Sequence, residues 1–272
     1  MNRIDQTFVK LKAVSKAALI PFLTIGDPNI ASSVKIIHEL EAGGADIIEL
    51  GVPYSDPLAD GPVIQESSQR ALLNKITILD CIQVARTCRE EGSQLPFILF
   101  TYYNPVLQVG LERFFMILSE NEISGIIIPD LPVEENGEVL ALAKQHNIHL
   151  IPLVAPTSND RIAKIVNSAT GFIYCVSSLG VTGTRAQFHT GINEFIELVK
   201  KSSELPVVVG FGISNSEQVA RFSQICDGVV VGSALVRKIG ESNSLLLSSN
   251  EADNQQGLLQ IREFVRELKS VN

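Results

Sequence analysis

The stretch that decides the fold is ADIIELG, residues 45–51, a short apolar run that ends in glycine and leads into a proline-marked loop. Its apolar residues are nearly continuous and lack the strict alternation of a strand with one solvated face. Such a run is typical of a parallel strand that is buried on both faces. Seven further short runs recur along the chain, most of them also continuous, at Ala18–Ile25, Pro96–Thr101, Gly125–Pro129, His149–Val154, Gly171–Val176, Pro206–Gly210 and Gly228–Val231.

Stretches with helical periodicity separate these eight runs, so strands and helices alternate from one end of the chain to the other. Eight such units predict an α/β protein with one closed (β/α)8 barrel, a TIM barrel, in a single domain over residues 1–272. The spacing of Phe8, Leu11 and Val14 predicts an extra helix before the first strand. An open, doubly wound sheet is the competing architecture, because one miscounted strand would open the barrel.

The segment Glu241–Gln256 departs from this pattern. It is rich in Ser, Asn, Asp and Gln around the apolar residues Leu245–Leu247. This composition predicts a mobile polar surface loop rather than a domain boundary.

Composition and charge exclude several classes of protein. The 272 residues are 45% hydrophobic and 19% charged, as in a folded globular protein, and the formal net charge of −8 with no basic cluster argues against nucleic acid as a partner. The four cysteines form neither a CxxC pair nor a Cys/His cluster, so we expect no metal site and a reducing compartment. No run approaches the ~20 apolar residues of a membrane helix. We therefore expect no membrane association and a location in the cytoplasm, or in a plastid stroma if the gene is plastid-encoded.

Candidate catalytic residues lie at and after the end of the second strand. Glu49 shares a strand face with Ile47, and a carboxyl inside an apolar strand is unfavourable unless it is paired or used. The loop ELGVPYSDPLADG, residues 49–61, adds Asp56 and Asp60. The ordinary alternatives are a buried Glu satisfied by Lys, Arg or backbone amides, and Asp residues that only form turns.

A candidate anion site follows the last two strands. Residues 209–213, VGFGI, precede Ser214 as a possible helix cap, and residues 228–234, GVVVGSA, lead into a helix beginning near Ser233. Glycines let backbone amides approach an anion, and a helix N-terminus favours a phosphate at the position this fold ordinarily uses. The alternative is that these glycines only mark the turns between strands and helices. Residues 174–185, YCVSSLGVTGTR, could form a lid.

Taken in order, PFLTIGDP, ELGVPYSDPLADGP, IIIPDLPVEE, YCVSSLGVTGTR, VGFGIS and GVVVGSA resemble the α subunit of tryptophan synthase. The resemblance spans nearly the whole chain. It implies cleavage of indole-3-glycerol phosphate to indole and glyceraldehyde 3-phosphate, with no cofactor or metal on this subunit. It also implies a partner β subunit that carries pyridoxal phosphate, in an α2β2 heterotetramer.

The resemblance also implies roles for particular residues. Glu49 corresponds to the general acid/base, and Asp60 to the carboxylate that contacts the indole nitrogen. Phe100 stands where we expect Leu, which leaves the shape of the indole pocket open. The remaining substrate-binding positions are Phe22 and Phe211 in the indole pocket, Tyr174 near the catalytic carboxyl, Thr182 in the closing loop, and Gly183, Phe211, Gly212, Gly232 and Ser233 around the phosphate.

The chemistry expected of the two acids follows from their surroundings. Burial should raise the pKa of Glu49 so that it can protonate carbon 3 of the indole ring, whereas Asp60, on a more solvated loop, should stay ionised. Proline-marked turns on adjacent loops predict the partner surface, at Pro53, Asp56, Pro57, Asn104 and Pro132, with Pro105 beside them. Competing functions are another phosphate-binding isomerase or epimerase, a protein that mainly activates its partner, and a free-standing indole-3-glycerol phosphate lyase.

Overall fold

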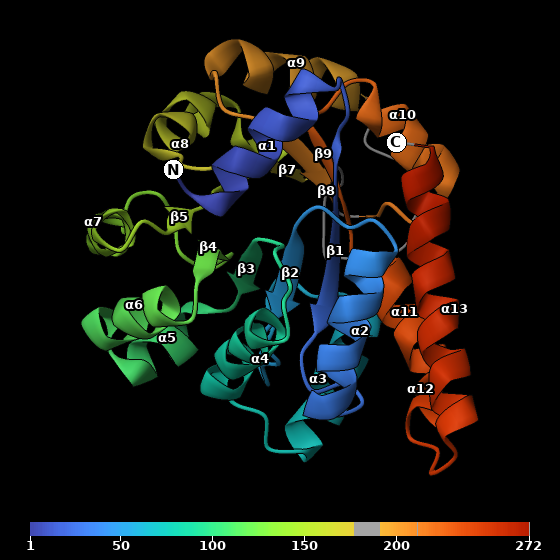
Figure 1. The fold of residues 1–272 in the computed structure, drawn as a ribbon. Coiled ribbons are helices and arrows are strands. Elements are labelled where there is room, and N and C mark those ends of the chain that lie inside the picture. Colours follow the sequence, from blue (N-terminus) through green and yellow to red (C-terminus); the bar gives the residue numbers. More distant parts are fainter. Residues whose placement is uncertain (177–190, 211, 272) are drawn as a thin grey trace.

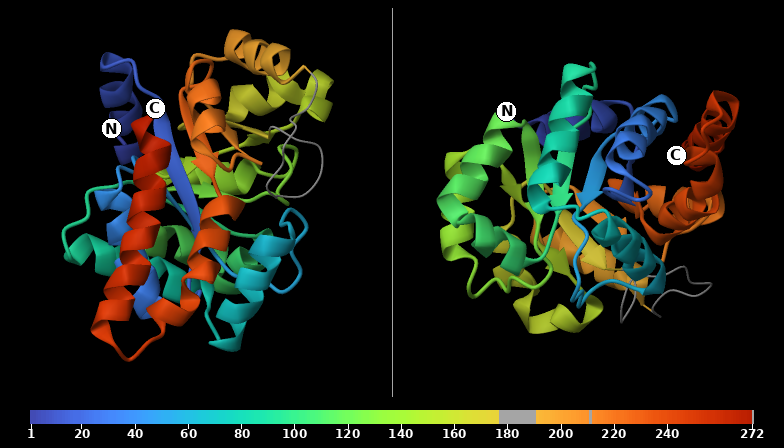
Figure 2. Two further views of the ribbon diagram at one scale, coloured as in Figure 1. Left: turned by 90° about the vertical axis from the view of Figure 1, so that its right-hand side faces the viewer. Right: turned by 90° about the horizontal axis from the view of Figure 1, so that it is seen from below.

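The computed structural model describes residues 1–176, 191–210 and 212–271. Its strands are all parallel and lie in one sheet, in the order β5-β4-β3-β2-β1-β9-β8-β7-β6. The two end strands, β5 (His149–Leu150) and β6 (Leu153–Val154), are halves of one predicted run. The sheet therefore closes on itself, and Figure 2 shows its strands encircled by helices. The predicted barrel is confirmed, and the open doubly wound alternative is wrong.

The seam between β5 and β6 is bridged by two residues. The N–H of Ile151 donates to Ile126 of β4 (3.0 Å), and the carbonyl of Pro152 accepts from Tyr174 of β7 (3.1 Å). Proline has no N–H for a ladder, which accounts for the break in an otherwise continuous strand. The other strands are β1 (Ala18–Thr24), β2 (Ile48–Gly51), β3 (Phe97–Phe100), β4 (Ile123–Ile127), β7 (Ile173–Val176), β8 (Val207–Gly210) and β9 (Gly228–Val231).

Helices surround the barrel in Figure 1, and the last of them, α13, packs along α2. In chain order they are α1 (Arg3–Ala13), α2 (Ile30–Ala42), α3 (Pro62–Leu73), α4 (Ile78–Glu90), α5 (Tyr103–Val109), α6 (Leu111–Glu120), α7 (Gly137–Gln145), the 3-10 helix η1 (Pro156–Arg161), α8 (Ile162–Ser168), α9 (Ile192–Ser202), α10 (Ser216–Ser223), α11 (Ser233–Glu241), α12 (Asn243–Leu246) and α13 (Glu251–Ser270). The extra N-terminal helix is confirmed as α1.

Strand β2 shows how the barrel sorts its side chains into two cores. Ile48 and Leu50 belong to the outer core between strands and helices, whereas Ile47 belongs to the inner core inside the barrel. Because strand side chains alternate, Glu49 shares the inner side with Ile47. The register pairs Glu49 with Phe22 of β1 and Ile98 of β3, both of the inner core.

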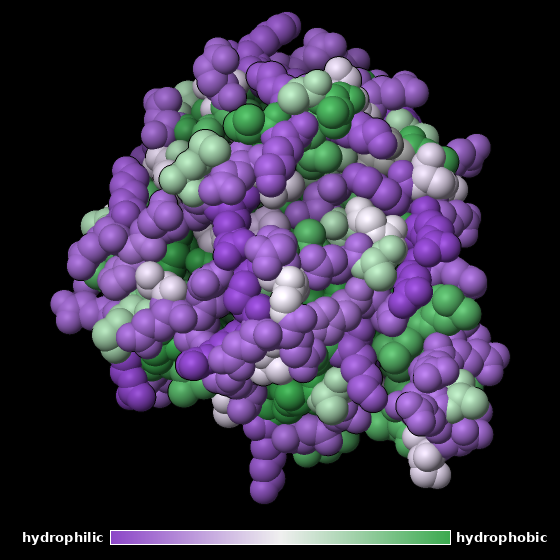
Figure 3. Space-filling view, viewed as in Figure 1, coloured by the Kyte–Doolittle hydropathy of each residue, from purple (hydrophilic) through white to green (hydrophobic). Residues whose placement is uncertain are grey.

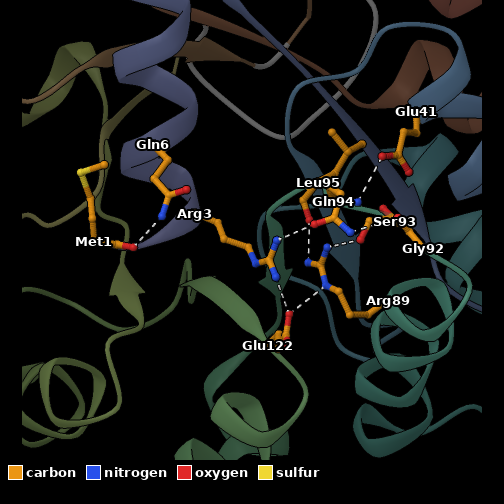
Figure 4. Close-up of polar contacts among 10 residues, drawn as sticks. All are labelled: Met1, Arg3, Gln6, Glu41, Arg89, Gly92, Ser93, Gln94, Leu95 and Glu122. Carbon is orange, nitrogen blue, oxygen red and sulfur yellow. Dashed lines mark hydrogen bonds and ion pairs between the residues drawn. The ribbon is translucent and has the colours of Figure 1, made fainter.

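Helix α1 covers the end of the barrel opposite the loops that follow the strands. Its cap residue Asn2 is buried and donates to the carbonyls of Ser124 and Asn147, each at 2.8 Å. Figure 4 shows a second attachment, in which Glu122 pairs with Arg3 (2.7 Å) and Arg89 (3.1 Å). These contacts join α1 to α4 and β4, so they stabilise the fold at this end of the barrel.

The predicted loop at Glu241–Gln256 is wrong, because most of this segment is helical. Leu246 of α12 is buried, and Asn250 accepts from the N–H of Ala252 to begin α13. Ser248 donates to Asp253 in the first turn of α13 (2.7 Å). Of the polar residues that indicated a loop, Asn250 is therefore the cap of α13, and Ser248 and Asp253 hydrogen-bond to each other beside it.

The face seen in Figure 3 is mostly hydrophilic, with apolar side chains in small separate groups. Among the residues that the structure describes, no helix combines the length and apolar character needed to cross a membrane. The same residues contain no group of three His, Cys, Asp or Glu side chains placed to hold a metal ion.

Candidate active site

A pocket opens among the ends of the strands, inside the ring of loops that follow them. It brings together eight of the predicted site residues and two, Ile64 and Val230, that the sequence analysis missed. Val230 lies two positions before Gly232 and faces inward by alternation, so strand periodicity could have identified it. The lining residues are Phe22, Glu49, Asp60, Ile64, Phe100, Tyr174, Gly212, Val230, Gly232 and Ser233.

Glu49 lies at the floor of this pocket and is only 1% exposed. Burial raises its pKa from the ordinary 4.5 to about 8. Its Oε1 atom is buried and has no hydrogen-bond partner among the described residues, and no Lys or Arg pairs with it there. The alternative of a structural Glu neutralised by a cation therefore finds no support in this part of the chain.

Asp60 faces the same pocket but is not solvated as expected. It is 6% exposed, and burial raises its pKa from 3.8 to about 6, against the opposing effect of a hydrogen bond from Tyr102. The loop as a whole is open, since Ser55, Asp56 and Leu58 are exposed, but it turns Asp60 inward at the start of α3. The expected ionised state still holds at pH 7, because the pKa stays below that value.

Aromatic rings form the walls of the pocket. Phe22 and Phe100 meet edge to face, with centroids 5.7 Å apart and planes at 83°. Glycines behind the rings make room for them. A Cβ on Gly51 would lie 2.4 Å from the ring of Phe22, and one on Gly210 would lie 2.2 Å from the hydroxyl of Tyr174. Larger residues at these two strand ends would push the rings out of position.

Glycines and a helix N-terminus form the other end of the pocket. Strands β8 and β9 are neighbours, so Gly212 and Gly232 beyond them line one site. Gly212 has a φ of +98°, a conformation that favours glycine, and α11 begins at Ser233. The cap of α10 is Asn215, which accepts from Gln218, so the expected cap at Ser214 is wrong by one residue.

Residues 8–272 match the family model described as tryptophan synthase alpha chain. The chain belongs to this family. It is 50% identical to the tryptophan synthase alpha chain of Geobacillus sp. (strain WCH70) over 96% of this chain and 98% of that one, and 52% identical to that of Bacillus subtilis (strain 168) over 89% and 90%. A crystal structure of tryptophan synthase subunit alpha from Legionella pneumophila superposes with a TM-score of 0.89 at 35% identity, over 100% of this chain and 98% of that one. A Mycobacterium tuberculosis tryptophan synthase chain gives 0.88 at 35%, over 99% and 98%.

Family membership confirms the expected class of reaction. The tryptophan synthase alpha chain is a lyase of tryptophan biosynthesis that cleaves indole-3-glycerol phosphate to indole and glyceraldehyde 3-phosphate. The family match does not favour another phosphate-binding barrel isomerase. The match spans nearly the entire chain, as the resemblance in motifs predicted.

Three of the predicted substrate-binding residues, Thr182, Gly183 and Phe211, lie outside the described residues. So do residues 177–185 of the predicted lid at 174–185, whose first three residues belong to β7. Phe100, which differs from the residue expected in the family, is an apolar wall of the pocket and contacts Phe22.

The predicted partner residues follow the neighbouring strands β2, β3 and β4, with Asn104 in the first turn of α5 and the others on loops. Asp56, Asn104 and Pro132 are exposed and Pro57 is half-buried. Pro53 is buried, so the expectation that it presents a partner surface is wrong for this chain alone, and it shapes the loop instead. The first two loops are in contact, because the ring of Tyr54 stacks on Tyr102 and its hydroxyl lies 3.5 Å from Asn104.

Proposed function

We propose that the pocket of Glu49 and Asp60 is the site at which indole-3-glycerol phosphate is cleaved. The observation that carries the proposal is a pair of buried carboxyls in one apolar pocket, with pKa values of about 8 and about 6. Near pH 7 the first is protonated and the second ionised. One pocket therefore offers both an acid and an anion.

The bond cleavage needs both groups. Carbon 3 of the indole ring must accept a proton before its bond to the glycerol chain can break, and Glu49 is the donor. Protonation leaves positive charge on the ring system, which the carboxylate of Asp60 stabilises at the ring nitrogen. As the bond breaks, Glu49, now a carboxylate, takes the proton from the glycerol hydroxyl that becomes the aldehyde. Glu49 is thereby reprotonated for the next cycle.

The glycine end of the pocket is the proposed phosphate site. The positive φ of Gly212 and the N-terminus of α11 at Ser233 present backbone N–H groups and a favourable helix dipole to an anion. The aromatic walls suit the indole ring, and Phe22 and Phe100 contact each other there edge to face. By family resemblance Thr182, Gly183 and Phe211 complete the site.

Gly212→Val is expected to weaken binding of a glycerol-phosphate analogue at least about tenfold, because Val is strained at a positive φ and its side chain blocks close approach of the anion. The measurement is titration calorimetry of the analogue. Gly110→Val is the matched control, since Gly110 has a φ of +87° and open space around it. The control shares the backbone strain but should bind normally. Equal binding by the two variants would place the phosphate elsewhere.

Incubation of this chain with indole-3-glycerol phosphate tests the proposed function directly. We expect release of indole and glyceraldehyde 3-phosphate in equal amounts, with no added cofactor or metal, and faster release when a matched β subunit is present. Stimulation separates this reading from a free-standing lyase, which would release indole at a rate that a β subunit does not change. A chain that released no indole under either condition would contradict the proposal.

The proposed partner is a β subunit that carries pyridoxal phosphate, in an α2β2 heterotetramer. The supporting observations are the similarity to Mycobacterium tuberculosis tryptophan synthase and the exposed rim formed by Asp56, Asn104 and Pro132. The rim residues follow β2, β3 and β4 at the same end of the barrel as the pocket, so a partner bound there could receive indole directly. A groove lined by Pro129, Pro132 and Pro152 extends this surface along the next loops.

Combined substitution of Asp56→Ala and Pro132→Ala is expected to weaken binding of the β subunit about tenfold, since truncating an important interface residue costs more than ~1 kcal/mol. Stimulation of indole release should fall with it. The control is Lys12→Ala with Glu204→Ala, two exposed residues at the opposite end of the barrel. Unchanged affinity and stimulation in the rim variant would move the partner surface elsewhere.

The proposed location is the cytoplasm or a plastid stroma. All four cysteines are free and buried, which supports a reducing compartment.

A further inference from the structure

Tyr102 lies directly behind Asp60 and belongs to no part of the site described so far. It follows β3, precedes α5, and is only 2% exposed although it is large and polar. Its ring stacks on Tyr54, with centroids 4.9 Å apart and planes at 25°. Its hydroxyl accepts the N–H of Ala59 at 3.0 Å. Tyr102 thus binds the loop between β2 and α3 at the residue immediately before Asp60.

The single proton of the Tyr102 hydroxyl is left for Asp60. A hydroxyl donates one hydrogen bond and accepts others, and here the N–H of Ala59 occupies an acceptor position. The side chain of Asp60 is hydrogen-bonded to this hydroxyl. The backbone of Asp60 is held separately, because Gln65 of α3 donates to its carbonyl at 2.7 Å. One side chain therefore fixes both the loop and the carboxylate that ends it.

We propose that Tyr102 is a positioning residue, whose hydroxyl holds the end of the loop at Ala59 and directs the Asp60 carboxylate toward the indole pocket. The proposal rests on the proposed function of Asp60. A hydrogen bond to the charged form of an acid favours that form, and it counts most where water is excluded. The pocket supplies that environment, since Asp60 is 6% exposed.

Among the residues that the structure describes, the other titratable groups near Asp60 do not supply this contact. Glu49 and Tyr174 lie across the pocket, and both are buried. An ionised Glu49 would disfavour the charge on Asp60. Asp130 is engaged by the backbone, because its two oxygens accept the N–H of Tyr103 at 2.9 Å and 3.2 Å. Asp56 is exposed, so its effect on Asp60 is screened by water.

The same contact links Asp60 to the proposed partner rim. Tyr54 stacks on Tyr102, and its hydroxyl lies 3.5 Å from Asn104 in the first turn of α5. Tyr102 is thus a buried residue that contacts the loop ending in Asp60 through the Ala59 N–H and approaches the rim through the ring of Tyr54.

The test compares Tyr102→Phe with the wild-type chain and with Tyr103→Phe. Phenylalanine keeps the ring and its stack and removes only the hydroxyl. Tyr103 is the next residue and a matched control, since the charges that act on its hydroxyl are those of Glu138 and Glu135 and not that of Asp60. Two quantities are measured in the full-length chain: the titration of the Asp60 carboxyl carbon by NMR, and the pH profile of indole release.

In Tyr102→Phe we expect Asp60 to titrate at higher pH than in the wild type. The ratio of wild-type to variant indole release should be about fivefold larger at pH 6 than at pH 8, because only the lower pH protonates the displaced Asp60. Tyr103→Phe should match the wild type in both measurements. An unchanged Asp60 titration in Tyr102→Phe overturns the proposal, and so does a loss of activity that is equal at both pH values. If the wild-type chain releases no indole, the proposed function fails, while the carboxyl titration still decides the role of Tyr102.

Discussion

Glu49→Gln is expected to reduce indole release by at least about 10³-fold, in the upper part of the range for loss of a general acid. The amide keeps the shape of the side chain but cannot protonate carbon 3 of the indole ring. In the wild type the active form of Glu49 is protonated, so indole release should fall as pH rises through about 8. Steady-state assays from pH 5 to pH 9 measure both effects, and any residual activity of the variant should lack this alkaline limb.

Binding separates a chemical role of Glu49 from a structural one. Glu49 lies at the aromatic floor of the pocket and not at its glycine end, so Glu49→Gln should bind a glycerol-phosphate analogue within about twofold of the wild type. Loss of analogue binding along with activity would point to a disrupted pocket. Activity within tenfold of the wild type would remove Glu49 from its role.

Asp60→Asn is expected to reduce indole release about 10²–10³-fold, the effect of removing one electrostatic contact to a transition state. The neutral amide cannot stabilise positive charge at the ring nitrogen. In the wild type the active form of Asp60 is ionised, so activity should fall as pH drops through about 6, and this limb should vanish in the variant. Together the two acids predict a bell-shaped profile between about 6 and about 8.

Asp56→Asn is the comparison for Asp60→Asn in the isolated chain, because Asp56 lies on the same loop but is exposed. It should change the rate little without a β subunit. A loss smaller than fivefold for Asp60→Asn would mean that this carboxyl only shapes the loop.

The barrel could be predicted because its strands are strongly apolar and regularly spaced. β2 lies inside the run at residues 45–51. The run His149–Val154 was predicted as one strand, and β5 and β6 both lie within it on either side of the break at Pro152. Glu49 could be predicted because a carboxyl within such a run is conspicuous. The sequence could not show that Glu49 has no cationic partner among the described residues, because this depends on which distant residues meet inside the barrel.

The sequence-based predictions were wrong where polar residues cap a helix or turn into the pocket, because composition does not show such local roles. Asn250 and Ser248 indicated a loop, but Asn250 caps α13 and Ser248 donates to Asp253 in its first turn. Asp60 appeared solvated because its loop is polar, whereas α3 and Tyr102 turn it inward. Tyr102 itself was missed, since a single Tyr after a strand carries no periodic signal and its partner lies 42 residues away in sequence.

The burial of the two acids also ties the folding of this chain to proton uptake. At pH 7 both carboxyls are ionised in the unfolded chain, since the ordinary pKa values are 4.5 for Glu49 and 3.8 for Asp60. In the folded chain Glu49, with a pKa of about 8, holds a proton, and Asp60, with a pKa of about 6, is protonated in a small fraction of molecules. The folded state binds more protons, so the free energy of unfolding decreases as pH rises from the ordinary values toward about 8. The enthalpy of folding at neutral pH then includes the heat of taking a proton from the buffer. The pocket that makes Glu49 an acid thus makes the barrel less stable above about pH 8 than at acidic pH.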